Sequence, residues 1–193
     1  MQKLDRNQKN AYFCEMNNKS SKMIKAKPFI KWVGGKSQLI EQLSALLPAD
    51  FGNWENATYI EPFAGGGAML FYMLQRYPNI QHAVINDINQ DLTTCYCTVR
   101  DCPEELINSL SKIEKEYLSL HSEEDRRSFF MDSRNHYNEK NLTPIENTTL
   151  FIFLNRTCFN GLYRVNKKGL FNVPFGKYKN PTICDAITIR KDS

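Results

Sequence analysis

Residues 61–71 read EPFAGGGAMLF, where three consecutive glycines separate an extended segment from an apolar segment of helical pattern. Glycine costs backbone entropy and contributes no packing, so the chain must need a close approach at this point. A strand that runs through a glycine turn into a helix directs backbone N–H groups and the helix N-terminus toward a ligand. The pattern predicts a binding site at this turn, although simple helix–strand packing also fits the glycines taken alone.

Three classes of ligand compete for the turn. A P-loop nucleotide is disfavoured, because no Lys-Ser/Thr follows the glycines and the GGKS at 34–37 has Ile30 in place of the first glycine. A dinucleotide is disfavoured, because Leu70 occupies the third glycine position of G-x-G-x-x-G. Asp87 ends the next predicted strand, twenty residues after Gly67, where an acid accepts hydrogen bonds from ribose hydroxyls. A nucleoside without pyrophosphate, such as S-adenosylmethionine, is therefore favoured.

A second stretch, PFIKWVGGKSQL at 28–39, combines an aromatic residue, a Gly-Gly turn and a lysine before a predicted helix. Taken alone, Trp32 fits a core position and Lys36 fits a surface position. Together with the unit at 61–87, they predict another side of the same pocket.

The elements that must position these residues alternate between strand and helix. Strands are predicted at 29–33, 57–63 and 82–87, and helices at 37–47, 68–77, 90–100, 103–120, 123–139 and 144–155. The strands read as buried and parallel, which indicates an α/β fold. After the last helix, YRV and LFNV flank Asn166-Lys167-Lys168-Gly169, which is a hairpin pattern.

Composition limits the function classes. The chain has 193 residues, 41% of them hydrophobic, and residues 1–26 read as a flexible basic lead-in without a signal-peptide core. The six cysteines then indicate a reducing, cytoplasmic location. Cys95, Cys97 and Cys102 lack paired C-x-x-C units or histidines at zinc spacing, so we expect helix core residues and no metal site.

Charge is distributed unevenly along the chain. Residues 1–36 have a net charge of +7, residues 37–154 have −9, and residues 155–193 have +6. Basic ends around an acidic middle are typical of a protein that binds a polyanion such as nucleic acid. An ordinary solvated surface with a basic tail explains the charge equally well.

Four motifs in order carry a family resemblance: KPFIKWVGGKSQL, IEPFAGGGAMLF, VINDIN and NRTCFNGLYRVNKKGLFNVPFGKYKNP. Over residues 27–181 the chain resembles the Dam-type (D12 class) DNA adenine-N6 methyltransferases. The resemblance implies a Rossmann-like sheet with an inserted helical target-recognition domain. It also implies methyl transfer from S-adenosylmethionine to N6 of an adenine flipped out of double-stranded DNA, at GATC-like sites and in restriction–modification.

The resemblance also assigns residues to the methyl donor. It implies that Trp32 and Lys36 line the donor site, Gly65 and Gly67 lie under it, Asp87 binds the ribose, and Glu61 and Phe63 face the methionine end.

A second set is implied to contact DNA. Lys31 would reach a base, and Phe159 would be an aromatic wedge in the stack that a flipped base leaves. The other implied contacts are Arg156, Asn160, Leu162, Arg164, Pro174, Lys177 and Tyr178. The chemistry agrees, because Arg164 and Lys177 can pair with guanine edges or phosphates. An ordinary hairpin with surface lysines remains the alternative.

One family motif is absent. The family holds the target amine with Asp-Pro-Pro-Tyr or a near variant, whereas none of the eight prolines here is adjacent to another. We therefore expect a truncated chain that has no catalytic residues of its own and is inactive alone. The motif's strand would pair with the 57–63 strand, and a second polypeptide is the expected source if the split is natural. The alternatives are a non-catalytic module that binds DNA or S-adenosylmethionine and, less favoured, a nucleotide-binding protein that uses GGKS.

The resemblance divides the chain into four segments. These are the lead-in at 1–26, the donor-binding Rossmann-like part at 27–100, the helical target-recognition domain with its hairpin at 101–181, and the start of a return to the catalytic domain at 182–193.

Overall fold

The computed structural model describes residues 12–17 and 26–193. The strands are β1 (Tyr12–Asn17), β2 (Ala57–Glu61) and β3 (Ile80–Asp87). The helices are α1 (Ile40–Ser44), α2 (Ala68–Arg76), α3 (Gln90–Asp101), α4 (Pro103–Ser119), α5 (Glu123–Asn138), α6 (Pro144–Thr157) and α7 (Ala186–Asp192). Short 3₁₀ turns are η1 (Lys36–Leu39), η2 (Phe51–Asn53) and η3 (Phe159–Gly161). The predicted α/β class is confirmed.

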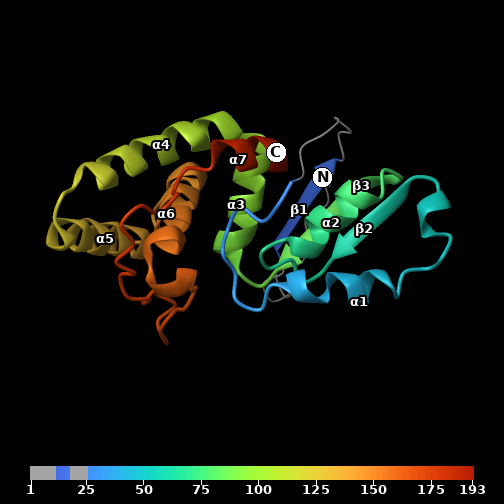
Figure 1. Ribbon diagram of the computed structural model, residues 1–193, viewed down its shortest axis with the longest axis horizontal. Helices are drawn as coiled ribbons and strands as arrows, with labels where there is room; N and C mark the ends of the chain where they lie inside the picture. The colour runs from blue at the N-terminus through green and yellow to red at the C-terminus, as the bar shows by residue number, and fades with distance from the viewer. Residues whose placement is uncertain (1–11, 18–25) are drawn as a thin grey trace.

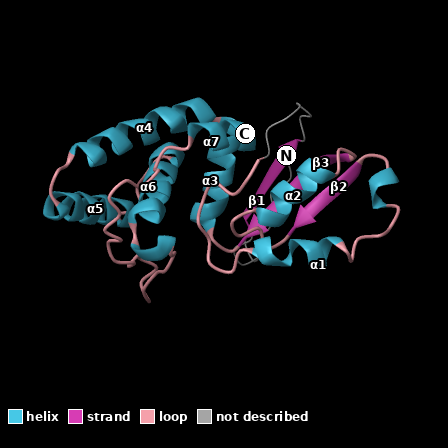
Figure 2. Ribbon diagram, in the orientation of Figure 1, coloured by secondary structure: helices cyan, strands magenta, loops and turns pink. Residues whose placement is uncertain are grey.

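The sheet lies at one end of the molecule and helices α4–α6 lie at the other, with α3 between them (Figure 1). Figure 2 shows the same separation, with the three strands gathered beside α2 and the opposite end built of helices and loops. Helix α3 follows β3 directly, so it carries the chain from the sheet to the helical end.

The strand order is β1-β3-β2, so β3 is central. Strand β2 is parallel to β3 with Glu61 opposite Ile85, as predicted for the strands at 57–63 and 82–87. Strand β1 is antiparallel to β3, with Tyr12 opposite Asp87. Among the described residues, β2 pairs on one side only and is therefore an edge strand.

Two predictions near the N-terminus are wrong. Part of the supposed flexible lead-in, residues 12–17, forms a strand whose backbone pairs with the outer side of β3. The rest of that lead-in up to residue 25 lies outside the described residues. The predicted strand at 29–33 is absent, because the Asn155 side chain takes the place of a neighbouring strand. Its Oδ1 accepts from the Lys31 N–H at 3.0 Å, and its Nδ2 donates to the Lys31 carbonyl at 2.8 Å.

The helices begin where the sequence supplies capping side chains. Asn89 accepts from the Leu92 N–H at the start of α3, and Thr143 and Glu146 form a capping box at the start of α6. The predicted helix at 37–47 is shorter than expected and consists of η1 and α1.

The predicted hairpin is present as a tight loop held by single bridges rather than by long strands. Val165 bridges Phe171, and Cys158 bridges Phe175. The Gly169 N–H donates to the Asn166 carbonyl at 2.9 Å and closes the turn.

One hydrophobic cluster joins the sheet to the helices. The predicted face of α3 is buried, and these residues are Leu92, Cys95, Tyr96 and Val99. Helix α6 is buried on nearly all sides from Thr148 to Asn155, which explains its continuous apolar sequence. Within the described part of the chain, no helix is both long and apolar enough to cross a membrane.

Candidate functional site

The glycine turn lies at the sheet edge where β2 and β3 both end. The Ala64 N–H donates to the Asn86 carbonyl at 2.9 Å, which holds the turn after β2 against the end of β3. The Gly65 N–H then donates to Asp87 Oδ2 at 2.9 Å, and the Asn89 N–H donates to Oδ1 at 2.9 Å. The predicted ribose acid therefore lies directly beside the predicted donor turn, and each of its oxygens keeps further acceptor capacity.

Close packing explains why this turn needs glycine. Gly67 has φ +77°, and a Cβ there would lie 2.6 Å from the Tyr96 hydroxyl. A Cβ at Gly65 or Gly66 would lie 3.1 Å from the Trp32 side chain. The Tyr96 hydroxyl also donates to the Gly65 carbonyl at 2.8 Å. Packing alone thus accounts for the three glycines, and the same contacts place Trp32 on the turn.

Lys36 is held by a nearly buried carboxylate. Its Nζ lies 2.6 Å from Glu61 Oε1 and also donates to the Phe63 carbonyl. Glu61 Oε2 accepts from the Tyr59 hydroxyl at 3.0 Å. Burial, together with the charge and the hydrogen bond of Glu61, raises the pKa of Tyr59 well above its ordinary range. Glu61 therefore neutralises and orients Lys36 at the mouth of the turn.

Exposed apolar side chains border these polar groups. Val33, Phe63 and Ile88 are 66%, 74% and 83% exposed, and they follow Trp32, Pro62 and Asp87 in the sequence. Such exposure is typical of a surface that contacts a ligand or a partner. Sequence reasoning identified Phe63 but missed Val33 and Ile88, although a large apolar residue directly after the ribose acid was a usable signal.

A basic pocket lies beside this site. It has a volume of about 310 Å³ and is lined by Lys31, Arg156, Tyr178, Lys179 and residues 180–182. Lys31 Nζ lies 5.2 Å from the centroid of the Tyr178 ring, which is cation–π distance. The structure thus brings together three of the residues predicted to contact DNA.

Arg156 is more enclosed than a simple surface contact. Its guanidinium donates to the Phe29 carbonyl at 2.6 Å, and its Nε has no hydrogen-bond partner among the described residues. Burial lowers the pKa of Arg156 from its ordinary value, while the charge of Asp185 opposes that shift. Because this Nε is buried, only the other N–H groups of the guanidinium can donate to an anionic ligand in the pocket.

The remaining residues predicted to contact DNA lie in the segment after α6, and they differ in solvent exposure. Phe159 is half exposed, and its N–H donates to the Pro174 carbonyl at 2.8 Å. Asn160 has φ +54°, and its N–H donates to the Tyr178 hydroxyl at 3.1 Å. Leu162 is partly buried and packs against the core. The aromatic ring predicted as a wedge is therefore accessible, and Pro174 and Tyr178 hold the backbone next to it.

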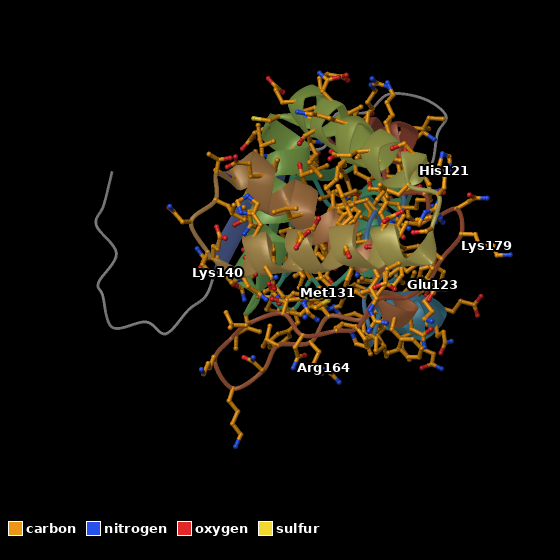
Figure 3. All side chains as sticks on the ribbon, turned by 90° about the vertical axis from the view of Figure 1, so that its left-hand side faces the viewer. His121, Glu123, Met131, Lys140, Arg164 and Lys179 are labelled. Carbon is orange, nitrogen blue, oxygen red and sulfur yellow. The ribbon has the colours of Figure 1, made fainter. Side chains whose placement is uncertain are left out.

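Two of the four cations predicted to contact DNA, Arg164 and Lys177, already have side-chain partners. Arg164 donates to Asn172 through Nε (2.8 Å to Oδ1) and Nη2 (3.1 Å to the carbonyl). Lys177 pairs with Glu123 at 2.5 Å, with both side chains well exposed. In Figure 3, Arg164 lies on the loop that projects from the helical end of the molecule. The hairpin thus has one guanidinium that Asn172 holds in a fixed orientation. It also has one lysine that can exchange its exposed glutamate partner for another anion.

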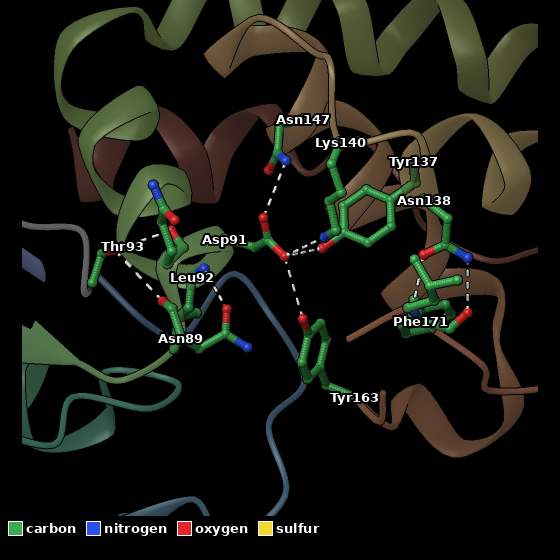
Figure 4. Close-up of polar contacts among 12 residues, drawn as sticks. Asn89, Asp91, Leu92, Thr93, Tyr137, Asn138, Lys140, Asn147, Tyr163 and Phe171 are labelled. Atoms are coloured by element: carbon green, nitrogen blue, oxygen red, sulfur yellow. Dashed lines mark hydrogen bonds and ion pairs between the residues drawn. The ribbon is translucent and has the colours of Figure 1, made fainter. Parts of the chain in front are cut away.

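Asp91 is a residue that sequence reasoning missed. Its carboxylate accepts from Tyr137 at 2.6 Å, Lys140 at 3.0 Å, Asn147 at 3.1 Å and Tyr163 at 3.3 Å (Figure 4). Burial would raise the pKa of Asp91, but the Tyr137 hydrogen bond and the Lys140 charge lower it below its ordinary value. No local pattern predicts this network, because its members come from α3, the end of α5, the loop after α5, α6 and the hairpin.

Cysteine and histidine do not gather into a metal site in the described ranges, where no group of three His, Cys, Asp or Glu residues is suited to a metal ion. Cys95 is fully buried in the core.

Comparisons with known proteins give a consistent result. The family model described as "D12 class N6 adenine-specific DNA methyltransferase" matches residues 32–191. Type II methyltransferase M.MjaIII of Methanocaldococcus jannaschii is 46% identical over 172 residues, which cover 88% of this chain and 59% of that protein. Type II methyltransferase M1.LlaDCHI of Lactococcus lactis is 38% identical over 173 residues, which cover 88% and 55%.

A third relative, the DNA adenine methylase of Vibrio cholerae, is 34% identical over 160 residues, which cover 82% of this chain and 51% of that protein. The chain therefore spans between half and three-fifths of the length of these relatives.

Proposed function

Because the chain belongs to the family of D12 class N6 adenine-specific DNA methyltransferases, we propose that it supplies the methyl-donor site and the DNA-reading surface of an adenine-N6 methyltransferase. Two of the relatives are named type II methyltransferases, which supports a role in restriction–modification. In this proposal, residues 27–100 form the donor-binding part, residues 101–181 form the target-recognition part, and residues 182–193 begin the return to the catalytic domain.

The donor is S-adenosylmethionine. The observation that carries this assignment is the hydrogen bond from the Gly65 N–H to Asp87, with Trp32 packed on the same turn. Asp87 has acceptor capacity left for ribose hydroxyls, and the turn leads into the N-terminus of α2. Val33 and Ile88 offer apolar surface for the adenine ring. Lys36, fixed by Glu61, would bind the carboxylate of the methionine end.

Calorimetric titration of the chain with S-adenosylmethionine tests this site. Asp87→Asn keeps the side-chain shape but removes the charge, and hydrogen bonds to a charged group contribute roughly 1.5–3 kcal/mol. We expect donor affinity to fall roughly tenfold to a hundredfold. The matched control is Asp101→Asn, since Asp101 is an exposed acid on α3 that pairs with neighbouring Arg100. Equal affinity of the Asp87 variant and the control would exclude Asp87 from the site.

The proposed partner is double-stranded DNA, read at GATC-like sites. The basic pocket at Lys31 and Arg156 has the charge and the size to hold a backbone phosphate. Arg164 on the hairpin would contact a base edge, and half-exposed Phe159 would fill the space left by a flipped adenine. Fluorescence anisotropy with a GATC duplex and a scrambled duplex measures the preference, and equal affinities would refute the proposed site.

Catalysis needs a further segment that carries an Asp-Pro-Pro-Tyr-like motif. Strand β2 pairs on one side only among the described residues, and Ile60 on it is 63% exposed. An edge strand of this kind has unpaired backbone groups on its outer side and is suited to the pairing of another strand. We therefore propose that the missing motif is brought to the donor site by a strand that adds to β2.

Transfer of tritiated methyl to unmethylated DNA tests this proposal. The chain alone is expected to show no turnover. Co-expression with the part of M.MjaIII that this chain does not match is expected to give a complex that methylates adenine. Turnover by the chain alone would refute the need for a second segment. Binding of donor and DNA without transfer in the complex would instead favour a non-catalytic binding module.

A further inference from the structure

Tyr163 connects the two halves of the proposed site. Its ring stacks on Trp32 with centroids 5.3 Å apart and an interplanar angle of 25°. In the sequence it lies between Leu162 and Arg164, both of which belong to the proposed DNA-reading segment. One side chain of that segment is thus in direct contact with the tryptophan that packs on the donor turn.

The hydroxyl of Tyr163 reaches the other side of the donor site. It donates to Asp91 at 3.3 Å, and Asp91 lies two residues after Asn89 on the same segment (Figure 4). The Asn89 N–H donates to Asp87, the proposed ribose acid. Tyr163 therefore touches both Trp32 and the segment that fixes Asp87.

Several neighbours restrict how Tyr163 can move. Its ring packs against Phe151 of α6 at 5.6 Å and against Phe171 of the hairpin at 5.8 Å. Asp91 is itself fixed by Tyr137 and Asn147. A shift of the hairpin must therefore either carry Tyr163 with it or break the stack on Trp32 and the bond to Asp91.

We propose that Tyr163 couples DNA reading to methyl-donor binding, so that each ligand strengthens the binding of the other. This inference rests on the proposed function. DNA that holds the hairpin in this arrangement also holds Tyr163, and with it the stack on Trp32 and the bond to Asp91. The donor then binds the arrangement that DNA has already selected, which gives positive cooperativity. Thermodynamic linkage requires that DNA raises the affinity for the donor by the same factor by which the donor raises the affinity for DNA.

The test is a pair of calorimetric titrations of the chain with S-adenosylhomocysteine, one without and one with saturating GATC duplex. The ratio of the two affinities is expected to be roughly 5–50 for the unmodified chain, within the usual range of coupling. Tyr163→Leu removes the stack and the hydroxyl, so its ratio is expected to fall to about one.

Phe129→Leu is the matched control. It removes a core ring that packs on Tyr117 and Phe153 rather than on Trp32 or Tyr163, so the ratio should stay within about twofold of the unmodified chain. A purely structural role of this aromatic cluster would instead lower stability in both variants and leave the ratio unchanged in each.

Tyr163→Phe decides the question if Tyr163→Leu does not fold. It retains the ring and loses only the hydroxyl, and the ratio should fall at least about threefold. Independent binding of both ligands by the unmodified chain, or an unchanged ratio in the folded Tyr163 variants, would overturn the coupling. Failure of the unmodified chain to bind either ligand would refute the proposed function itself.

Discussion

The proposed donor turn and the proposed DNA-reading hairpin hold their polar side chains in different ways. In the donor turn, Asp87 accepts from backbone N–H groups, and Lys36 is held by the nearly buried Glu61. In the hairpin, Arg164 bonds to Asn172 at an exposed position, and Lys177 pairs with an exposed glutamate. The first arrangement is built into the sheet edge, whereas the second lies on a loop with solvent-accessible partners.

The difference fits the two proposed ligands. A small nucleoside with fixed geometry is best bound by groups that are oriented before it arrives. Duplex DNA is read by side chains that exchange one polar partner for another at little cost, because exposed ion pairs contribute only about 0–1 kcal/mol. If this comparison holds, substitutions in the turn should affect stability, and substitutions in the hairpin should affect DNA binding with little effect on stability.

The largest effect is expected from a matched pair of glycines. Gly67 (φ +77°) and Gly169 (φ +74°) have nearly the same backbone conformation, but a Cβ added at Gly67 would meet atoms within 4 Å, whereas one added at Gly169 would meet none. Gly67→Ala should cost about 3 kcal/mol of unfolding free energy, from left-handed strain plus overpacking against Tyr96. Gly169→Ala should cost about 1 kcal/mol, from strain alone.

Urea unfolding followed by circular dichroism measures both variants. Equal losses for Gly67→Ala and Gly169→Ala would show that the donor turn is no more tightly packed than the hairpin, and the contrast between the two regions would fail.

A smaller effect is expected from a matched pair of lysines. Lys36→Met leaves the nearly buried Glu61 without its cation, which should cost about 2 kcal/mol of stability, a value below that of a fully buried pair because Lys36 is partly exposed. Lys177→Met breaks a pair whose side chains are 60% and 58% exposed, so the loss should stay below about 1 kcal/mol. The same unfolding assay compares them. A larger loss of unfolding free energy in Lys177→Met than in Lys36→Met would contradict the proposed contrast between the two regions.

The two regions also differ in how far the sequence predicted them. General patterns predicted β2, β3, α2 and the neighbouring positions of the glycine turn and Asp87, because parallel strand ends meet at one edge and their spacing is local. The turn of the hairpin was predicted from its sequence pattern. The residues in it that are proposed to contact DNA were identified by resemblance, since short loops carry little periodicity.

Some features were beyond prediction because they depend on distant partners. The pairing of Asn155 with both backbone groups of Lys31 replaced the expected strand at 29–33. Strand β1 depends on the free side of β3, and nothing in its own sequence outweighed the polar composition around it. The Asp91 network joins residues up to 72 positions apart in the sequence. Local propensity contains no information about any of these contacts.

The third prediction concerns sequence discrimination. Arg164→Ala should reduce the preference for a GATC duplex over a duplex with one altered pair by about 1–2 kcal/mol. This is the lower part of the range for a bidentate base contact, because Asn172 already bonds to the guanidinium. Donor affinity without DNA and unfolding free energy should stay unchanged. Fluorescence anisotropy with both duplexes measures the preference. If the variant still prefers the GATC duplex as strongly as the unmodified chain does, Arg164 contacts the DNA backbone and not a base.

The smallest effect is expected at the tip of the same hairpin. Lys168 is exposed, and the turn next to it is held by backbone and Asn166 contacts rather than by its ammonium group. Its ammonium can therefore reach a phosphate without disturbing the fold. Lys168→Ala should weaken binding to all duplexes alike and reduce the slope of log affinity against log salt by about one.

The measurement is a salt titration with the GATC and scrambled duplexes, and Lys112→Ala on α4 is the control for a lysine outside the hairpin. A loss confined to the GATC duplex would show that Lys168 contacts a base, which would extend sequence reading from Arg164 to the hairpin tip.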